Sequence, residues 1–224
     1  MERIPEPDLM DEAEQARAYS EADFAEPHDT FVELAAEKLL PLVPDLDDIA
    51  DWLDLGCGPA DITCRWALRF TQHHIDGVDG ADAMLHLGRD RVERQGLSSR
   101  IRLHRAFLPA DAAPASNYRG VFSNSLLHHL QDPLDLWRTM QRDVVKGAPV
   151  FVMDLMRPHD EATVDRFVTE YAAGEPEVLQ KDFRASLFAA YTLNEVRDQL
   201  QSCGLGHLQV EATSDRHLIV YGRL

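Results

Sequence analysis

Residues 51–63 read DWLDLGCGPADIT, in which an apolar strand-like run passes through Gly56, Cys57 and Gly58 into a helix-like run. Small residues between a buried strand and a helix leave room for a ligand to approach the backbone. The helix that follows also offers unpaired N–H groups at its start. This stretch therefore predicts a ligand site, although a tight strand-to-helix turn without a ligand shows the same pattern.

Apolar residues on both sides of this stretch alternate between strand-like and helix-like spacing. The strands are expected near residues 52–55, 75–78, 101–103, 121–122 and 150–155. This alternation predicts right-handed crossovers and a parallel sheet covered by helices on both faces, which is the doubly wound α/β class. Residues 208–212 and 217–221 follow each other closely, so they are expected to pair as an antiparallel hairpin.

Capping signals mark the expected helix ends. The sequence of residues 30–33, TFVE, is a capping box and predicts a helix start at Thr30. A second capping box at residues 192–195 predicts the last helix, and Asp132 with the proline after it predicts the helix that ends at residues 146–147. Residues 156–191 hold two further amphipathic stretches, broken at residues 174–176, and they are called the insertion below.

The amino-acid composition and charge of the chain limit the kinds of partner that it is expected to bind. The chain has 224 residues, of which 45% are hydrophobic, and this predicts one domain over residues 1–224. A formal net charge of −17 repels phosphate, so neither nucleic acid nor an anionic membrane is expected as a partner. The N-terminus is acidic, and no apolar run is long enough to cross a membrane. The three cysteines lack metal spacing, which predicts free thiols, a cytoplasmic location and no metal.

A carboxylate at the end of the second predicted strand indicates the kind of ligand. Asp79 stands 21 positions after Gly58 and is suited to accept hydrogen bonds from both hydroxyls of a ribose, although it also suits a helix cap. NAD and S-adenosylmethionine both contain such a ribose. A dinucleotide motif needs glycine where Asp61 stands, and an acid there repels a pyrophosphate. Asp54 is placed to hold a cationic ammonium group, so S-adenosylmethionine is favoured.

Residues 30–222 resemble the class I S-adenosylmethionine-dependent methyltransferases. The resemblance rests on residues 53–59 (LDLGCGP), on residues 77–79 (GVD) with 83–85 (AML), on residues 123–130 (SNSLLHHL), and on the terminal hairpin. It implies a mostly parallel seven-stranded sheet with an antiparallel last strand, N-terminal helices, and a helical insertion after strand 5. It also implies an enzyme that transfers a methyl group from S-adenosylmethionine to a small molecule.

The resemblance assigns cofactor-binding roles to residues around the opening stretch. The methionine part is expected over Asp54, Gly56 and Gly58, the ribose at Asp79, and the sulfonium near Asn124. The adenine is expected near Met84 and Phe107, with Cys57, Gly80 and Tyr19 completing the set. The chain departs from the family at Ala60, which replaces a third glycine, and at residues 106–107, where many members carry an acid.

Acceptor residues are expected outside the common core. His128 and His129 are the imidazoles nearest the mouth of the site, and His128 is the candidate general base if the acceptor arrives protonated. Histidines at this place also help to build the following loop. Arg157 and Arg184 are candidates to pair with a substrate carboxylate, although charged residues on a helix usually face solvent.

Two segments are expected to cover the cofactor and select the acceptor. They are residues 1–40, an N-terminal helical segment that includes Tyr19, Asp23 and Phe24, and the insertion. A connection as long as the insertion is unusual between a strand and a helix, so it is expected to lie over the ligand-binding edge of the sheet. Ordinary packing of its apolar stripes is the alternative.

Two other functions remain open from the sequence. An RNA or protein methyltransferase uses the same cofactor motifs, and the charge disfavours RNA. A non-catalytic module that binds the cofactor and regulates a partner also keeps these motifs. Transfer of labelled methyl groups into a metabolite extract distinguishes an enzyme from such a module.

Overall fold

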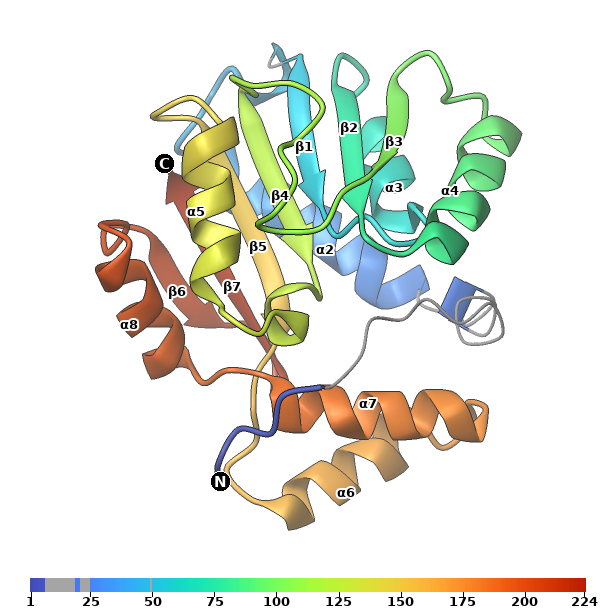
Figure 1. Cartoon of the computed structure of the whole chain (residues 1–224), viewed down its shortest axis with the longest axis vertical. Helices are drawn as coiled ribbons and strands as arrows, with labels where there is room; N and C mark the ends of the chain where they lie inside the picture. Colours follow the sequence, from blue (N-terminus) through green and yellow to red (C-terminus); the bar gives the residue numbers. More distant parts are fainter. Residues whose placement is uncertain (7–18, 21–24, 49) are drawn as a thin grey trace.

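The computed structural model describes residues 1–6, 19–20, 25–48 and 50–224 of the chain. A seven-stranded sheet of order β3-β2-β1-β4-β5-β7-β6 forms its centre (Figure 1). The strands are β1 (Asp51–Leu55), β2 (His74–Asp79), β3 (Ile101–Arg105), β4 (Gly120–Asn124), β5 (Pro149–Leu155), β6 (Gln209–Ala212) and β7 (His217–Arg223).

Strands β1 to β5 are parallel, and β7 runs antiparallel to both β5 and β6. The predicted doubly wound sheet with a terminal antiparallel hairpin is confirmed. The chain builds outward from β1 to β3 and then returns to place β4 on the other side of β1. Strand order therefore reverses between β1 and β4, and ligands bind at such a point, beyond the carboxyl ends of the strands.

Helices cover both faces of the sheet (Figure 1). Along β1, Trp52 packs into the core on the side of α2, α3 and α4, whereas Leu53 packs into the core on the side of α5 and α8. Successive strand residues point to opposite faces, and both faces are buried here. The helices are α2 (Ala25–Leu39), α3 (Asp61–Arg69), α4 (Asp82–Arg94), α5 (Leu134–Asp143) and α8 (Leu193–Ser202).

The insertion forms α6 (Glu161–Tyr171) and α7 (Glu177–Ala189), which lie together beyond the carboxyl end of β5 (Figure 1). Leu155 at the end of β5 packs with Phe167 of α6 and Leu187 of α7 in a separate small core. The first six residues run alongside α7, where the Ile4 N–H donates to the carbonyl of Phe188 at 3.0 Å. Both insertion helices thus lie at the ligand-binding edge of the sheet.

Two predicted helix ends are wrong. Helix α2 already includes Ala25, and the Thr30 hydroxyl donates to the Glu26 carbonyl at 2.8 Å within the helix, so Thr30 is not a cap. Helix α5 ends at Asp143 because Val144 leaves the helix to bridge Tyr118. The capping box at Thr192 is confirmed. Among the described residues, no helix has both the length and the apolar composition needed to cross a membrane.

Candidate functional site

The turn from β1 to α3 alternates through left-handed backbone conformations. Gly56 has φ 74°, Gly58 has φ 50° and Ala60 has φ 58°. A Cβ on Gly56 would lie 2.9 Å from the Cβ of Leu126, whereas one on Gly58 would meet nothing within 4 Å. Glycine is therefore required at Gly56 by both backbone and packing. The space in front of Gly58 is open to a ligand.

Asp79 faces this turn from the end of β2. One of its carboxylate oxygens accepts from the Gly58 N–H and the other from the Ala81 N–H, both at 2.8 Å. These two bonds fix the carboxylate, and each oxygen of a carboxylate can accept more than one hydrogen bond. A cap on the turn and a contact with a vicinal diol are therefore compatible roles for Asp79.

Asp54 lies beneath the same turn and is 3% exposed. Its carboxylate accepts from the Thr63 hydroxyl at 2.6 Å. Burial, with the charge of Asp79, raises the pKa of Asp54 to about 7 against the opposing effect of the Thr63 bond. A buried carboxyl of this kind gains charge when a cation binds beside it. The environment of Asp54 therefore suits an ammonium group.

An apolar wall stands beside Asp79. Tyr19 packs against the buried side chain of Met84 at the start of α4. The guanidinium of Arg91 donates to the carbonyls of Pro59, at 2.7 Å, and Ser20, at 3.3 Å. These bonds hold residues 19–20 next to the β1–α3 turn. Tyr19 and Met84, predicted separately, are thus brought together where an adenine could lie.

The phenol of Tyr19 stays neutral in this position. Burial, with the negative charges of Asp61 and Asp79, raises its pKa to about 12. A neutral phenol can donate a hydrogen bond while its ring packs against an apolar surface. Asp23 and Phe24, also predicted to cover the site, lie outside the described residues.

Cys57 packs behind the turn. A Cβ on Gly77 would lie 3.0 Å from the Cys57 Cβ, so the two residues are in close contact. Burial, with the charges of Asp79 and Asp54, raises the pKa of the Cys57 thiol well above its ordinary value. The thiol is therefore unreactive, and Cys57 contributes packing and its backbone to the turn.

The remaining predicted cofactor residues lie around the rim. Phe107 is 42% exposed, with the Arg105 guanidinium 5.0 Å from its ring centre, and its N–H donates to the Asp111 carboxylate at 2.9 Å. Gly80 follows Asp79, and its carbonyl accepts from Arg105 at 3.4 Å. Asn124 ends β4 and donates to the Ser125 hydroxyl at 3.0 Å.

Asp61 is a fixed negative charge at the start of α3. Its carboxylate lies 2.6 Å from His28 Nδ1 and 2.7 Å from Arg65 Nε, with Arg91 at 3.7 Å. Burial acts to raise its pKa, but the bonds to His28 and Arg65 outweigh burial and lower it. An ionised carboxylate at this helix start disfavours a pyrophosphate, as the sequence predicted.

His128 lies in a buried pair at the carboxyl ends of β4 and β5. It belongs to the short 3₁₀ helix η2 (Leu127–His129), and its Nδ1 is 2.6 Å from Oδ1 of Asp154. Burial acts to lower the pKa of His128, but the charge and hydrogen bond of Asp154 outweigh it, and the pKa is raised. The Asp154 carboxylate thus makes the imidazole more basic, and the role of His128 as general base stays a prediction.

The two arginines predicted to hold a substrate carboxylate make ion pairs within the chain. Arg157 donates to the Ala190 carbonyl at 3.1 Å and to Glu195 at 2.6 Å, so it anchors the start of α8. Arg184 donates to two acids of α6 and so ties α7 to α6. Each guanidinium thus has a carboxylate partner within the chain, and a contact of either arginine with substrate stays a prediction.

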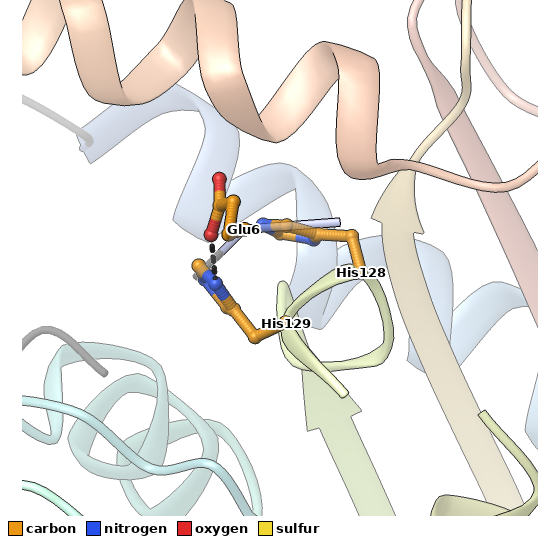
Figure 2. A group of neighbouring side chains, drawn as sticks. All are labelled: Glu6, His128 and His129. Carbon is orange, nitrogen blue, oxygen red and sulfur yellow. Dashed lines mark ion pairs between the residues drawn. The ribbon is translucent and has the colours of Figure 1, made fainter. Parts of the chain in front are cut away.

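Three residues that the sequence motifs did not single out meet near His128. Arg3 stacks on the Tyr191 ring at 4.2 Å and donates only to backbone carbonyls among the described residues. Glu6 lies 2.5 Å from Nδ1 of His129 (Figure 2). Asp154 had a detectable signal, because it is a lone acid in the buried strand β5. The other two are recognised only from the folded chain.

The chain is similar in sequence to known methyltransferases. Residues 53–147 match the family described as a methyltransferase domain. The chain is 35% identical over 127 residues to a trans-aconitate 2-methyltransferase of Azoarcus sp. (strain BH72), which covers 57% of this chain and 47% of that protein. For a protein of the same description from Variovorax paradoxus (strain S110), the identity is 31% over 144 residues, covering 63% and 51%. The chain thus spans about half the length of these curated relatives.

Solved structures are similar in fold. The plantazolicin methyltransferase BpumL, in complex with a triazolic desmethylPZN analogue and SAH, has a TM-score of 0.70 at 11% identity, covering 94% of this chain and 92% of that chain. A SAM-dependent methyltransferase from Aquifex aeolicus has a TM-score of 0.56 at 15% identity, covering 88% and 97%.

Proposed function

We propose that this chain, whose residues 53–147 match a methyltransferase domain, is a class I S-adenosylmethionine-dependent methyltransferase that transfers a methyl group from S-adenosylmethionine to a small organic acid. The observation that carries the cofactor assignment is the geometry of Asp79, fixed by two backbone N–H groups opposite the open space at Gly58. This arrangement fits the ribose of a nucleoside, and Asp54 beneath it fits a cationic amino group.

Each part of the site has a proposed binding task. Asp79 holds the ribose hydroxyls, and Tyr19 with Met84 provides an apolar surface for the adenine. Asp54 balances the ammonium charge, and Asn124 lies at the β4 end beside the transfer position. When bound, S-adenosylmethionine supplies an activated methyl group, so the chain itself has to align the acceptor and exclude water, and such positioning is worth up to about 7–11 kcal/mol.

The acceptor class is inferred from charge and from the relatives. Proteins described as trans-aconitate 2-methyltransferases act on a small polycarboxylic acid by name. Arg3 supports an acid here, because its guanidinium lies at the carboxyl edge of the sheet and makes no ion pair with a described carboxylate. A carboxylate acceptor arrives without a proton, so its methylation does not require a general base.

We assign the selection of the acceptor to residues 1–40 and the insertion, within a single domain over residues 1–224. Their placement supports this role, because residues 1–6 and helix α7 both lie beside η2 at the ligand-binding edge. Free cysteines at positions 57, 64 and 203 support a reducing, cytoplasmic compartment.

The proposal is tested in two steps. Calorimetry should show binding of S-adenosylmethionine and its demethylated product but not of NAD. Asp79→Ala should weaken this binding by about 1.5–3 kcal/mol, the value of a lost charge-assisted contact. Asp82→Ala, three positions along on the exposed start of α4, is the matched control and should bind like the unmodified chain. Equal affinity of the Asp79 variant would mean that the ribose contact is misassigned.

Transfer is then measured with a methyl-labelled cofactor and a panel of di- and tricarboxylic acids that includes trans-aconitate. The proposal expects label in at least one acid, and none in tRNA or protein. Tight cofactor binding with no transfer to the panel or to a metabolite extract would favour the non-catalytic module.

A further inference from the structure

Three potential metal ligands meet beside the proposed acceptor position. They are Glu6, His128 and His129, and one ligand atom from each lies within 4.8 Å of the others (Figure 2). Glu6 comes from the N-terminal segment, whereas the two histidines belong to η2 after β4. Because 122 positions separate Glu6 from His128, the sequence showed no metal spacing and predicted no metal.

The ligand atoms are oriented by further contacts. Nδ1 of His128 is engaged by Asp154 at 2.6 Å, which leaves Nε2 as the atom available to a metal. Asp154 is itself fixed by the N–H groups of Leu127, at 2.8 Å, and Leu155, at 2.7 Å. Ligating histidines usually donate their other ring N–H to such a carboxylate.

Glu6 and His129 are held in a similar way. One carboxylate oxygen of Glu6 accepts from the Ser186 hydroxyl of α7 at 2.7 Å, and the other lies 2.5 Å from His129 Nδ1. Both side chains are partly exposed, with 11% of Glu6 and 28% of His129 accessible, so an ion from solvent can reach them. The cluster is therefore held in place by hydrogen bonds and is still accessible to solvent.

From this arrangement we propose that Glu6, His128 and His129 form a binding site for a divalent transition metal ion such as Zn²⁺. Two imidazoles and one carboxylate are a ligand set that suits Zn²⁺ or Fe²⁺ and not Mg²⁺ or Ca²⁺. Three protein ligands leave coordination positions open, and an acceptor oxygen at this edge of the sheet would be able to fill one of them. The ion would hold an acceptor oxygen there.

Charge and spacing fit a dication. A bound dication would displace the protons from the ligating ring nitrogens, so that Glu6 and Asp154 contribute two negative charges and Arg3 one positive charge around the site. Ligand atoms of a tetrahedral zinc site lie about 3.3 Å apart. Binding therefore requires side-chain rotations that change the distances between ligand atoms by about 1–1.5 Å, separating Glu6 from His129 and bringing His128 closer. Movements of this size need only side-chain adjustment.

The test is metal binding by the full chain without cofactor or acceptor, so its result does not depend on methyl transfer. Purified, chelator-treated protein is titrated with Zn²⁺ and Co²⁺, and the bound ion is measured by calorimetry, metal analysis and cobalt absorption. We expect one ion per chain. Glu6→Gln and His129→Ala should each weaken binding at least about 100-fold, and Ser186→Ala about 10-fold, as for an outer contact.

His104→Ala is the matched control. His104 forms another histidine–carboxylate pair, 2.8 Å from Asp76, and should be replaceable without loss of metal. Circular dichroism shows whether each variant folds. Because Glu6 and His129 are partly exposed, their replacement should leave the fold intact, so that a loss of metal can be told apart from a folding defect. The proposal is overturned if the unmodified chain binds no stoichiometric metal, or if Glu6→Gln and His129→Ala bind it as tightly as His104→Ala does. In that case the three residues form ion pairs only.

Discussion

Replacing Asp54 with asparagine should stabilise the protein without its cofactor while weakening cofactor binding. Asparagine has nearly the same shape and keeps an oxygen that can accept the 2.6 Å bond from Thr63. It removes a carboxyl group that is 3% exposed and is costly to ionise. The substitution therefore isolates the cost of keeping a buried negative charge at this position.

The magnitude follows from the pKa of Asp54, which burial raises from 3.8 to about 7. Between these two values the folded chain holds a proton that the unfolded chain has released, so the free energy of unfolding falls as pH rises. The full difference corresponds to about 4 kcal/mol. Asp54→Asn should thus have nearly the same stability as the unmodified chain at pH 4 and exceed it by up to about 4 kcal/mol at pH 8.

Urea unfolding followed by circular dichroism at several pH values measures this difference, provided that the m-value is unchanged. Asp51→Asn, on the exposed first position of the same strand, controls for the loss of one negative charge. In calorimetry at pH 8, Asp54→Asn should bind S-adenosylmethionine at least about tenfold more weakly, or about 1.4 kcal/mol. A stability difference that stays constant from pH 4 to pH 8 would refute the reasoning, because the carboxyl would then ionise as it does in the unfolded chain.

Three further predictions concern packing, the two arginines and partners. Gly77→Ala should lower the free energy of unfolding by about 1–3 kcal/mol in thermal or urea unfolding, because the new Cβ would lie 2.8 Å from Leu103 Cδ2; unchanged stability would mean that this contact is not tight. Arg157→Met should destabilise the fold by about 1.5–3 kcal/mol, since it removes a buried partner of Glu195, whereas exposed Arg184→Met should cost less than about 1 kcal/mol. Neither arginine variant should change the KM for the acceptor by more than about threefold; a larger rise in KM for a carboxylate acceptor would support the predicted substrate role. With a net charge of −17, the chain should give no gel shift with tRNA or duplex DNA at submicromolar protein concentration, and a salt-sensitive shift would contradict this.

The amino-acid sequence by itself determined the layers of the fold and brought out the residues of the proposed cofactor half of the site. Strand and helix periodicity, with the spacing from Gly58 to Asp79, depends on residues close together in the chain. Short-range backbone geometry then places the β1–α3 turn opposite the end of β2, where Asp79 meets the Gly58 N–H. The helix start at Thr30 was wrong because the same residues also fit a helix interior, where the hydroxyl bonds the preceding turn.

Only the tertiary structure decided the acceptor half. Whether an arginine is available to a ligand depends on which acids the fold brings to it, and Glu195 reaches Arg157 from 38 positions away. In the same way, Glu6 meets His128 and His129 only because the N-terminal segment packs alongside α7. Such contacts are set by the packing of whole elements against one another, and neither local spacing nor charge pattern encodes them.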